Sequence, residues 1–121
     1  MKIEKSTLAK DLVDFTATTA SGQKFGRDTL HHFCSPLFLD AMYILFDKNV
    51  ATTSCGSGRE RGILPGITGE FDKLSDKNKQ IATPLMISDN EFRLGVEITD
   101  TTTYGEFTQK IVALANKFVA Q

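Results

Sequence analysis

Apolar residues recur at helical spacing in two segments of the chain. Ser35 is a good N-cap and the proline after it suits the first helical position, so a helix is expected over 36–48. Apolar side chains cover more than one stripe of this helix, which indicates burial on most of its surface. A second helix is expected over 104–119, where Thr103 and Glu106 form a capping box.

Strict alternation of apolar and polar residues predicts a strand over 92–98. Its apolar face is Phe92, Leu94, Val96 and Ile98, and its other face is Arg93, Gly95 and Glu97. One face is expected to belong to the core, and the other to be solvated or to face a ligand. A partner strand is expected over 85–87, joined through a turn at Asp89-Asn90.

Shorter elements complete the prediction. They are a helix over 6–15 capped by Ser6, a strand or loop over 16–19, a strand over 50–54, and a helix over 76–82 capped by Ser75 and ended by Pro84. Together these elements predict a small two-layer α+β domain, with helices packed on one face of a mixed or antiparallel sheet. We expect one globular domain over residues 1–121. The apolar face of the strand over 92–98 should contact Phe107, Ile111, Leu114 and Phe118 of the last helix.

The composition is that of an ordinary globular protein, with 121 residues, 40% hydrophobic and 24% charged. A net charge of −1 gives no basic excess, so neither nucleic-acid nor membrane binding is expected. No segment approaches the ~20 apolar residues of a transmembrane helix, and no signal-peptide core follows Met1. Cys34 and Cys55 make no disulfide scaffold, which favours a cytoplasmic location with reduced thiols. Pairing into a homo-oligomer is compatible with so small a sheet.

Candidate chemistry concentrates in one glycine-rich segment. Five of the nine glycines lie between Gly56 and Gly69. Glycine lets successive N–H groups converge into an anion-binding concavity, while serine hydroxyls and arginine forks add donors. The expected ligand-binding residues are Ser54, Gly56, Ser57, Gly58, Arg59 and Arg61, complemented by Arg93 from the strand over 92–98. The expected ligand is a small anion, phosphate-bearing or nucleotide-derived, with no cofactor.

Two stricter phosphate motifs can be compared with this segment. The Walker A loop needs a lysine, which the segment lacks. Cys55, Gly58 and Arg61 satisfy C-x-x-G-x-x-R, which resembles the phosphate-binding loop of the cysteine-dependent phosphatases. The resemblance implies Cys55 as nucleophile and Arg61 as phosphate clamp. It covers seven residues and departs from the family pattern: Ser54 replaces a common histidine, Gly62 replaces a hydroxyl residue, and no Asp-Pro pair offers a general acid.

A metal site is not expected. His31, His32 and Cys34 form one irregular cluster, and Cys55 lies far along the chain. Zinc usually takes three or four ligands from two short spaced pairs. Adjacent histidines of an extended chain point to opposite faces, so they do not easily share a metal.

Three functions therefore remain open. The first is small-anion binding by the glycine-rich segment. The second is a non-catalytic protein-interaction factor, such as an inhibitor, an immunity protein or a phage–host conflict protein. The third is a phosphatase that uses Cys55, which the incomplete motif makes the weakest. The glycine-rich segment could also be a mobile surface loop whose arginines are solvated. The sequence favours a protein that is not an enzyme without deciding the matter.

Overall fold

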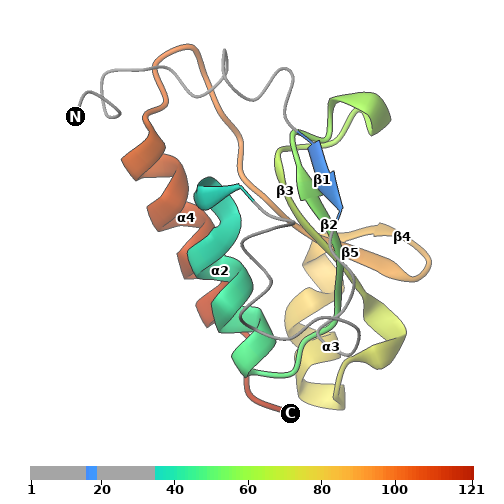
Figure 1. Ribbon diagram of the computed structural model, residues 1–121. Coiled ribbons are helices and arrows are strands. Elements are labelled where there is room, and N and C mark those ends of the chain that lie inside the picture. Colours follow the sequence, from blue (N-terminus) through green and yellow to red (C-terminus); the bar gives the residue numbers. More distant parts are fainter. Residues whose placement is uncertain (1–15, 19–34) are drawn as a thin grey trace.

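The computed structural model describes Thr16–Thr18 and residues 35–121 (Figure 1). The helix expected over 6–15 and the segment with His31, His32 and Cys34 lie outside these residues. The described elements, in chain order, are β1 (Thr16–Thr18), α2 (Pro36–Asp47), β2 (Thr52–Gly56), β3 (Gly66–Glu70), α3 (Asp76–Ala82), β4 (Met86–Ser88), β5 (Glu91–Gly95) and α4 (Tyr104–Asn116). Short 3-10 turns lie at Arg59–Arg61, Phe71–Lys73 and Thr83–Leu85.

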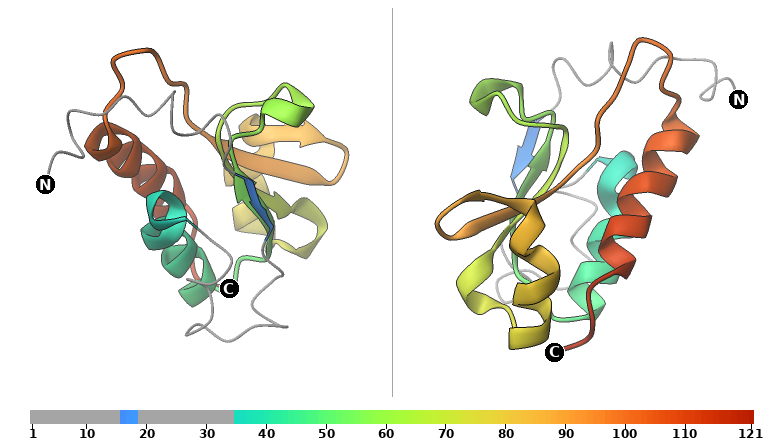
Figure 2. Two further views of the ribbon diagram at one scale, coloured as in Figure 1. Left: turned by 45° about the horizontal axis from the view of Figure 1, so that its top comes forward. Right: turned by 180° about the vertical axis from the view of Figure 1, so that it is seen from behind.

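The five described strands form one sheet in the order β1-β2-β3-β5-β4. Every neighbouring pair is antiparallel. Helices α2 and α4 lie side by side across one face of this sheet (Figures 1 and 2). This arrangement confirms the expected α+β class with its helical layer, and the sheet is antiparallel throughout its described part.

The predicted caps of α2, α3 and α4 are confirmed. The Ser35 hydroxyl accepts a hydrogen bond from the Leu37 N–H at 3.3 Å and starts α2. Asn49 ends the turn after α2 with a φ of 62°, a conformation that asparagine tolerates better than most residues. At the start of α4, the Thr103 hydroxyl and the Glu106 carboxylate each accept a backbone N–H, which satisfies two otherwise unpaired donors.

Phenylalanine side chains join the helices to each other and to the sheet. The rings of Phe38 and Phe107 meet edge to face with centroids 5.5 Å apart, joining α2 to α4. The rings of Phe92 and Phe118 lie 5.4 Å apart, joining β5 to the residues after α4. The core also holds Leu94, Val96 and Ile111, with Ile98 and Leu114 packed against it. The predicted contact between the strand and the last helix is therefore confirmed.

Strand β3 corrects the sequence analysis, which left residues 66–69 in a glycine-rich connection. It lies at the centre of the sheet, between β2 and β5. A Cβ on Gly66 would collide with the Leu94 carbonyl, and one on Gly69 would collide with the Phe92 ring. These two glycines therefore allow a close approach of β5, and glycine in a strand often marks such an approach.

A polar network ties α3 to the end of the chain. Asn78 is fully buried and exchanges hydrogen bonds of 2.8 Å with both the N–H and the carbonyl of Val119. Its amide nitrogen also donates to the Gln121 side chain at 2.7 Å. The Lys48 ammonium donates to the carbonyl of Phe118 at 2.6 Å, close to the C-terminal end of α4, where a cation is favourable.

We expect Asn78→Ala to destabilise the protein by about 1–3 kcal/mol, because it leaves buried polar groups of Val119 without their partner. The free energy of unfolding, measured in urea, checks this. Asn116→Ala is the matched control, since that side chain is exposed on α4 and should cost less than about 0.5 kcal/mol. Equal stability of the two variants would contradict the assigned role of Asn78.

Candidate binding loop

The glycine-rich segment connects β2 to β3 across residues 57–65. It folds around the 3-10 turn at Arg59–Arg61 and projects beyond the sheet (Figure 2). Phosphate cradles commonly end at the N-terminus of a helix. This loop instead returns to an antiparallel strand, so no α-helix follows it.

Backbone hydrogen bonds within the loop decide its shape. Gly58 and Gly62 have φ angles of 74° and 69°, which non-glycine residues rarely adopt. The N–H groups of Gly62 and Ile63 donate to the carbonyls of Arg59 and Gly58 at 3.1 and 3.0 Å. The Arg59 N–H donates to the Ser57 hydroxyl at 3.4 Å. These three donors stabilise the loop itself.

Arg93 is the most constrained cation of the described chain. Its side chain lies on the sheet face opposite α2 and α4, and only 6% of the residue is exposed. Its Nε donates to the Leu64 carbonyl at 2.6 Å, and one terminal nitrogen donates to the Thr68 hydroxyl at 2.6 Å. The other terminal nitrogen donates to the Gly56 carbonyl at 3.0 Å. One guanidinium thus joins the ends of the loop to β3.

This placement corrects the expectation of a solvated face at Arg93, and the three hydrogen bonds of the guanidinium go to acceptors within the protein. Burial is the main cause that lowers the pKa of Arg93 to about 10, and the nearby charge of Arg61 contributes to the lowering. That pKa is still far above neutrality, so the guanidinium stays charged. A buried charge is tolerated where hydrogen bonds replace its hydration. Here its acceptors are two backbone carbonyls and a hydroxyl.

Arg59 and Arg61 are exposed on the loop. The side chain of Arg61 is 51% exposed and makes a 2.9 Å ion pair with Glu91 at the start of β5. The hydrogen bond from Arg61 lowers the pKa of Glu91, against the opposing effect of partial burial. Glu91 is therefore ionised at neutral pH and competes with any anion for Arg61.

Cys55 lacks the surroundings that the phosphatase resemblance implies. It is only 2% exposed and packs in the hydrophobic core with Ile67 of β3. Arg61 lies at the surface with Glu91 and does not fold over the sulfur. A thiol in a core packs as a small hydrophobe, whereas a nucleophilic cysteine needs an accessible, cationic setting.

The structure thus divides the predicted site into two groups. Gly56, Ser57 and Arg93 are buried, and with the half-buried Ser54 and Gly58 they shape the strand ends and the loop. Arg59 and Arg61 remain available to a ligand. The clustering of glycines has a structural cause, because two provide turns and two allow close strand packing.

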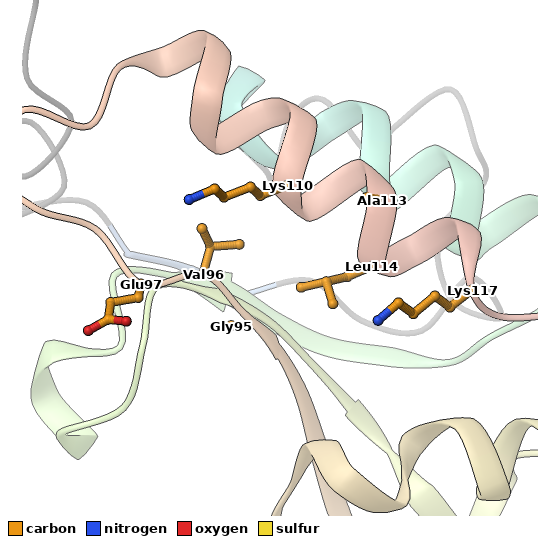
Figure 3. A pocket seen from close by; sticks show the side chains of 7 residues that line it. All are labelled: Gly95, Val96, Glu97, Lys110, Ala113, Leu114 and Lys117. Carbon is orange, nitrogen blue, oxygen red and sulfur yellow. The ribbon is translucent and has the colours of Figure 1, made fainter.

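A second concave region was not found from the sequence. It is an open hollow of about 320 Å³ between the end of β5 and α4 (Figure 3). Its lining comprises Gly95, Val96, Glu97, Lys110, Ala113, Leu114 and Lys117. The helical periodicity of the last helix assigned Leu114 to the core. In the structure Leu114 is only partly buried and lines this hollow.

Comparison of the chain with protein-family models, with curated proteins and with solved structures found no match. Among the described residues, no helix has the length and apolar character needed to cross a bilayer. Within that same part of the chain, no three histidine, cysteine or acidic side chains gather where they could hold a metal ion.

We expect Arg93→Met to destabilise the protein by about 1–3 kcal/mol and to loosen the loop, since three acceptors lose their donor. Urea unfolding measures the first effect, and amide hydrogen exchange of residues 57–65 measures the second. Arg93→Lys should not restore the loop, because one ammonium cannot reproduce the planar fork. If amide hydrogen exchange of residues 57–65 is the same in Arg93→Met as in the wild type, the guanidinium does not stabilise the loop.

We also expect no turnover of p-nitrophenyl phosphate, because the Cys55 thiol is buried and therefore inaccessible to the substrate. The assay compares the wild type with Cys55→Ser, which removes the thiol and changes little volume. Phosphate release that disappears in Cys55→Ser would overturn this expectation.

Proposed function

We propose that the protein is a non-catalytic binding domain whose β2–β3 loop recognises an anionic group through Arg59 and Arg61. One observation carries the proposal: a buried arginine holds the loop, and two exposed arginines lie on its turn. A loop held in one conformation loses little entropy when it binds. Pre-organised guanidinium groups bind carboxylates and phosphates well, because their planar forks match both.

The source of the anionic group that we favour is an acidic surface of another protein. The loop projects from the sheet and carries Leu64, which is 46% exposed, in addition to its two arginines (Figure 2). Arginine is enriched among the residues that dominate protein interfaces, and an exposed apolar side chain adds area to be buried. The N–H groups of Arg61, Gly62 and Ile63 bond within the loop, so in this proposal the exposed side chains make the contact.

A small phosphate-bearing ligand, such as a nucleotide derivative, is the second candidate. The observation that favours it is the position of Arg59 and Arg61 two residues apart on one short turn. Two forks so close in sequence could clamp one phosphate, with the ligand replacing Glu91 on Arg61.

We expect Glu91→Gln to strengthen anion binding about two- to fivefold, because it removes the carboxylate that competes for Arg61 at an exposed pair. Calorimetry measures this with two probes: a glutamate-rich peptide that contains leucine, and ADP-ribose. Tighter binding of the peptide supports the protein surface, and tighter binding of ADP-ribose supports the small ligand.

Two variants control this measurement. Replacing both Arg59 and Arg61 by alanine should remove binding of either probe, whereas Lys77→Ala, on the exposed side of α3, should leave it unchanged. Binding that survives the double replacement, or that Glu91→Gln leaves unaltered, contradicts the proposed role of the loop.

A further inference from the structure

The hollow between β5 and α4 opens at a strand edge. Val96 donates its N–H to the Pro65 carbonyl at 2.9 Å and so continues the pairing of β5 with the β3 side. In an antiparallel ladder, successive residues direct their N–H and C=O groups to opposite edges. The polar backbone groups of Gly95 therefore point away from β3, toward the edge where β4 would lie.

Strand β4 does not reach that position. Its pairing with β5 covers Met86 with Phe92 and Ser88 with Glu91, and it stops before Gly95. Within residues 35–121, no strand pairs with the outer edge of Gly95. An unpaired strand edge is a template for an additional strand.

The side chains around this edge define what such a strand would carry. Val96, Ala113 and Leu114 give the hollow an apolar lining (Figure 3). Its charged residues are Lys110 and Lys117 of α4 and Glu97 after β5, so the two cations outnumber the one carboxylate. The two lysines are seven residues apart, about 10 Å along a helix axis. Strand residues four apart are separated by about 13 Å. Long, flexible lysine side chains can make up the difference between this length and the spacing of the two lysines.

We propose that this edge binds an extended peptide segment of another protein by strand addition at Gly95. The segment presents an apolar side chain to the lining of the hollow and acidic side chains, four residues apart, to Lys110 and Lys117. Backbone hydrogen bonds to Gly95 supply affinity, and the apolar and acidic positions supply specificity. A lipid or a free anion has no backbone donors and acceptors with which to pair this edge. The site uses no residue of the β2–β3 loop.

The test uses the synthetic heptapeptide Thr-Glu-Thr-Val-Thr-Glu-Thr with blocked ends. Its partner peptide has lysine in place of both glutamates. We expect the acidic peptide to bind about tenfold more tightly, since lysine–lysine repulsion replaces two attractive pairs. We also expect the bound acidic peptide to slow amide hydrogen exchange at Gly95, which a side-chain contact alone would not do. No binding at about 1 mM acidic peptide, a concentration that detects weak association, overturns the proposal.

Two variants distinguish the contribution of backbone hydrogen bonds to peptide binding from the contribution of the two lysine charges. Glu97→Pro removes an N–H two residues beyond Gly95 on the same edge and should abolish peptide protection of Gly95. Reversal of both lysines, Lys110→Glu with Lys117→Glu, should switch the preference to the lysine peptide, whereas Lys77→Glu on α3 should not. Unchanged preference after the double reversal overturns the proposal. So does protection of Gly95 that grows with protein concentration in the absence of peptide, because it assigns the edge to a second copy.

Discussion

The hydrogen bonds of the buried Arg93 guanidinium are the interaction on which the conformation of the β2–β3 loop depends. Its three hydrogen bonds reach the carbonyls of Gly56 and Leu64, near the two ends of the loop, and the hydroxyl of Thr68 in the central strand. Burying a charge is unfavourable unless hydrogen bonds replace its hydration. These hydrogen bonds therefore stabilise one conformation of the loop. That conformation determines where the exposed Arg59 and Arg61 lie.

The helical layer has a separate origin, because it rests on apolar packing. Four buried phenylalanines join α2, α4 and β5 and pack in one core with the sheet: Phe38, Phe92, Phe107 and Phe118. Glycines at positions 66 and 69 keep the central strand close to β5. The two faces of one sheet are thus stabilised differently: a hydrophobic core on the helical face and a hydrogen-bonded cation on the other.

Both candidate surfaces present charged side chains beside apolar ones. On the loop, exposed arginines accompany an ion pair that a ligand must displace. At the end of β5, two lysines flank a hollow beside an edge with which no strand of the described residues pairs. The thiol singled out by its motif packs in the core.

The sequence by itself determined the elements whose signals are local. The caps of α2 and α4, the alternation through Phe92 and Leu94, and the turn at Asp89-Asn90 depend on neighbours a few residues away, so they were predicted correctly. Only the tertiary structure decided the roles of β3, Arg93 and Cys55. Their surroundings come from strand register, which brings together residues 25 to 37 positions apart in the bonds of Arg93. Burial, and not residue type, turned the expected anion-binding arginine into the support of its loop, because a desolvated guanidinium bonds to whatever acceptors the register places around it.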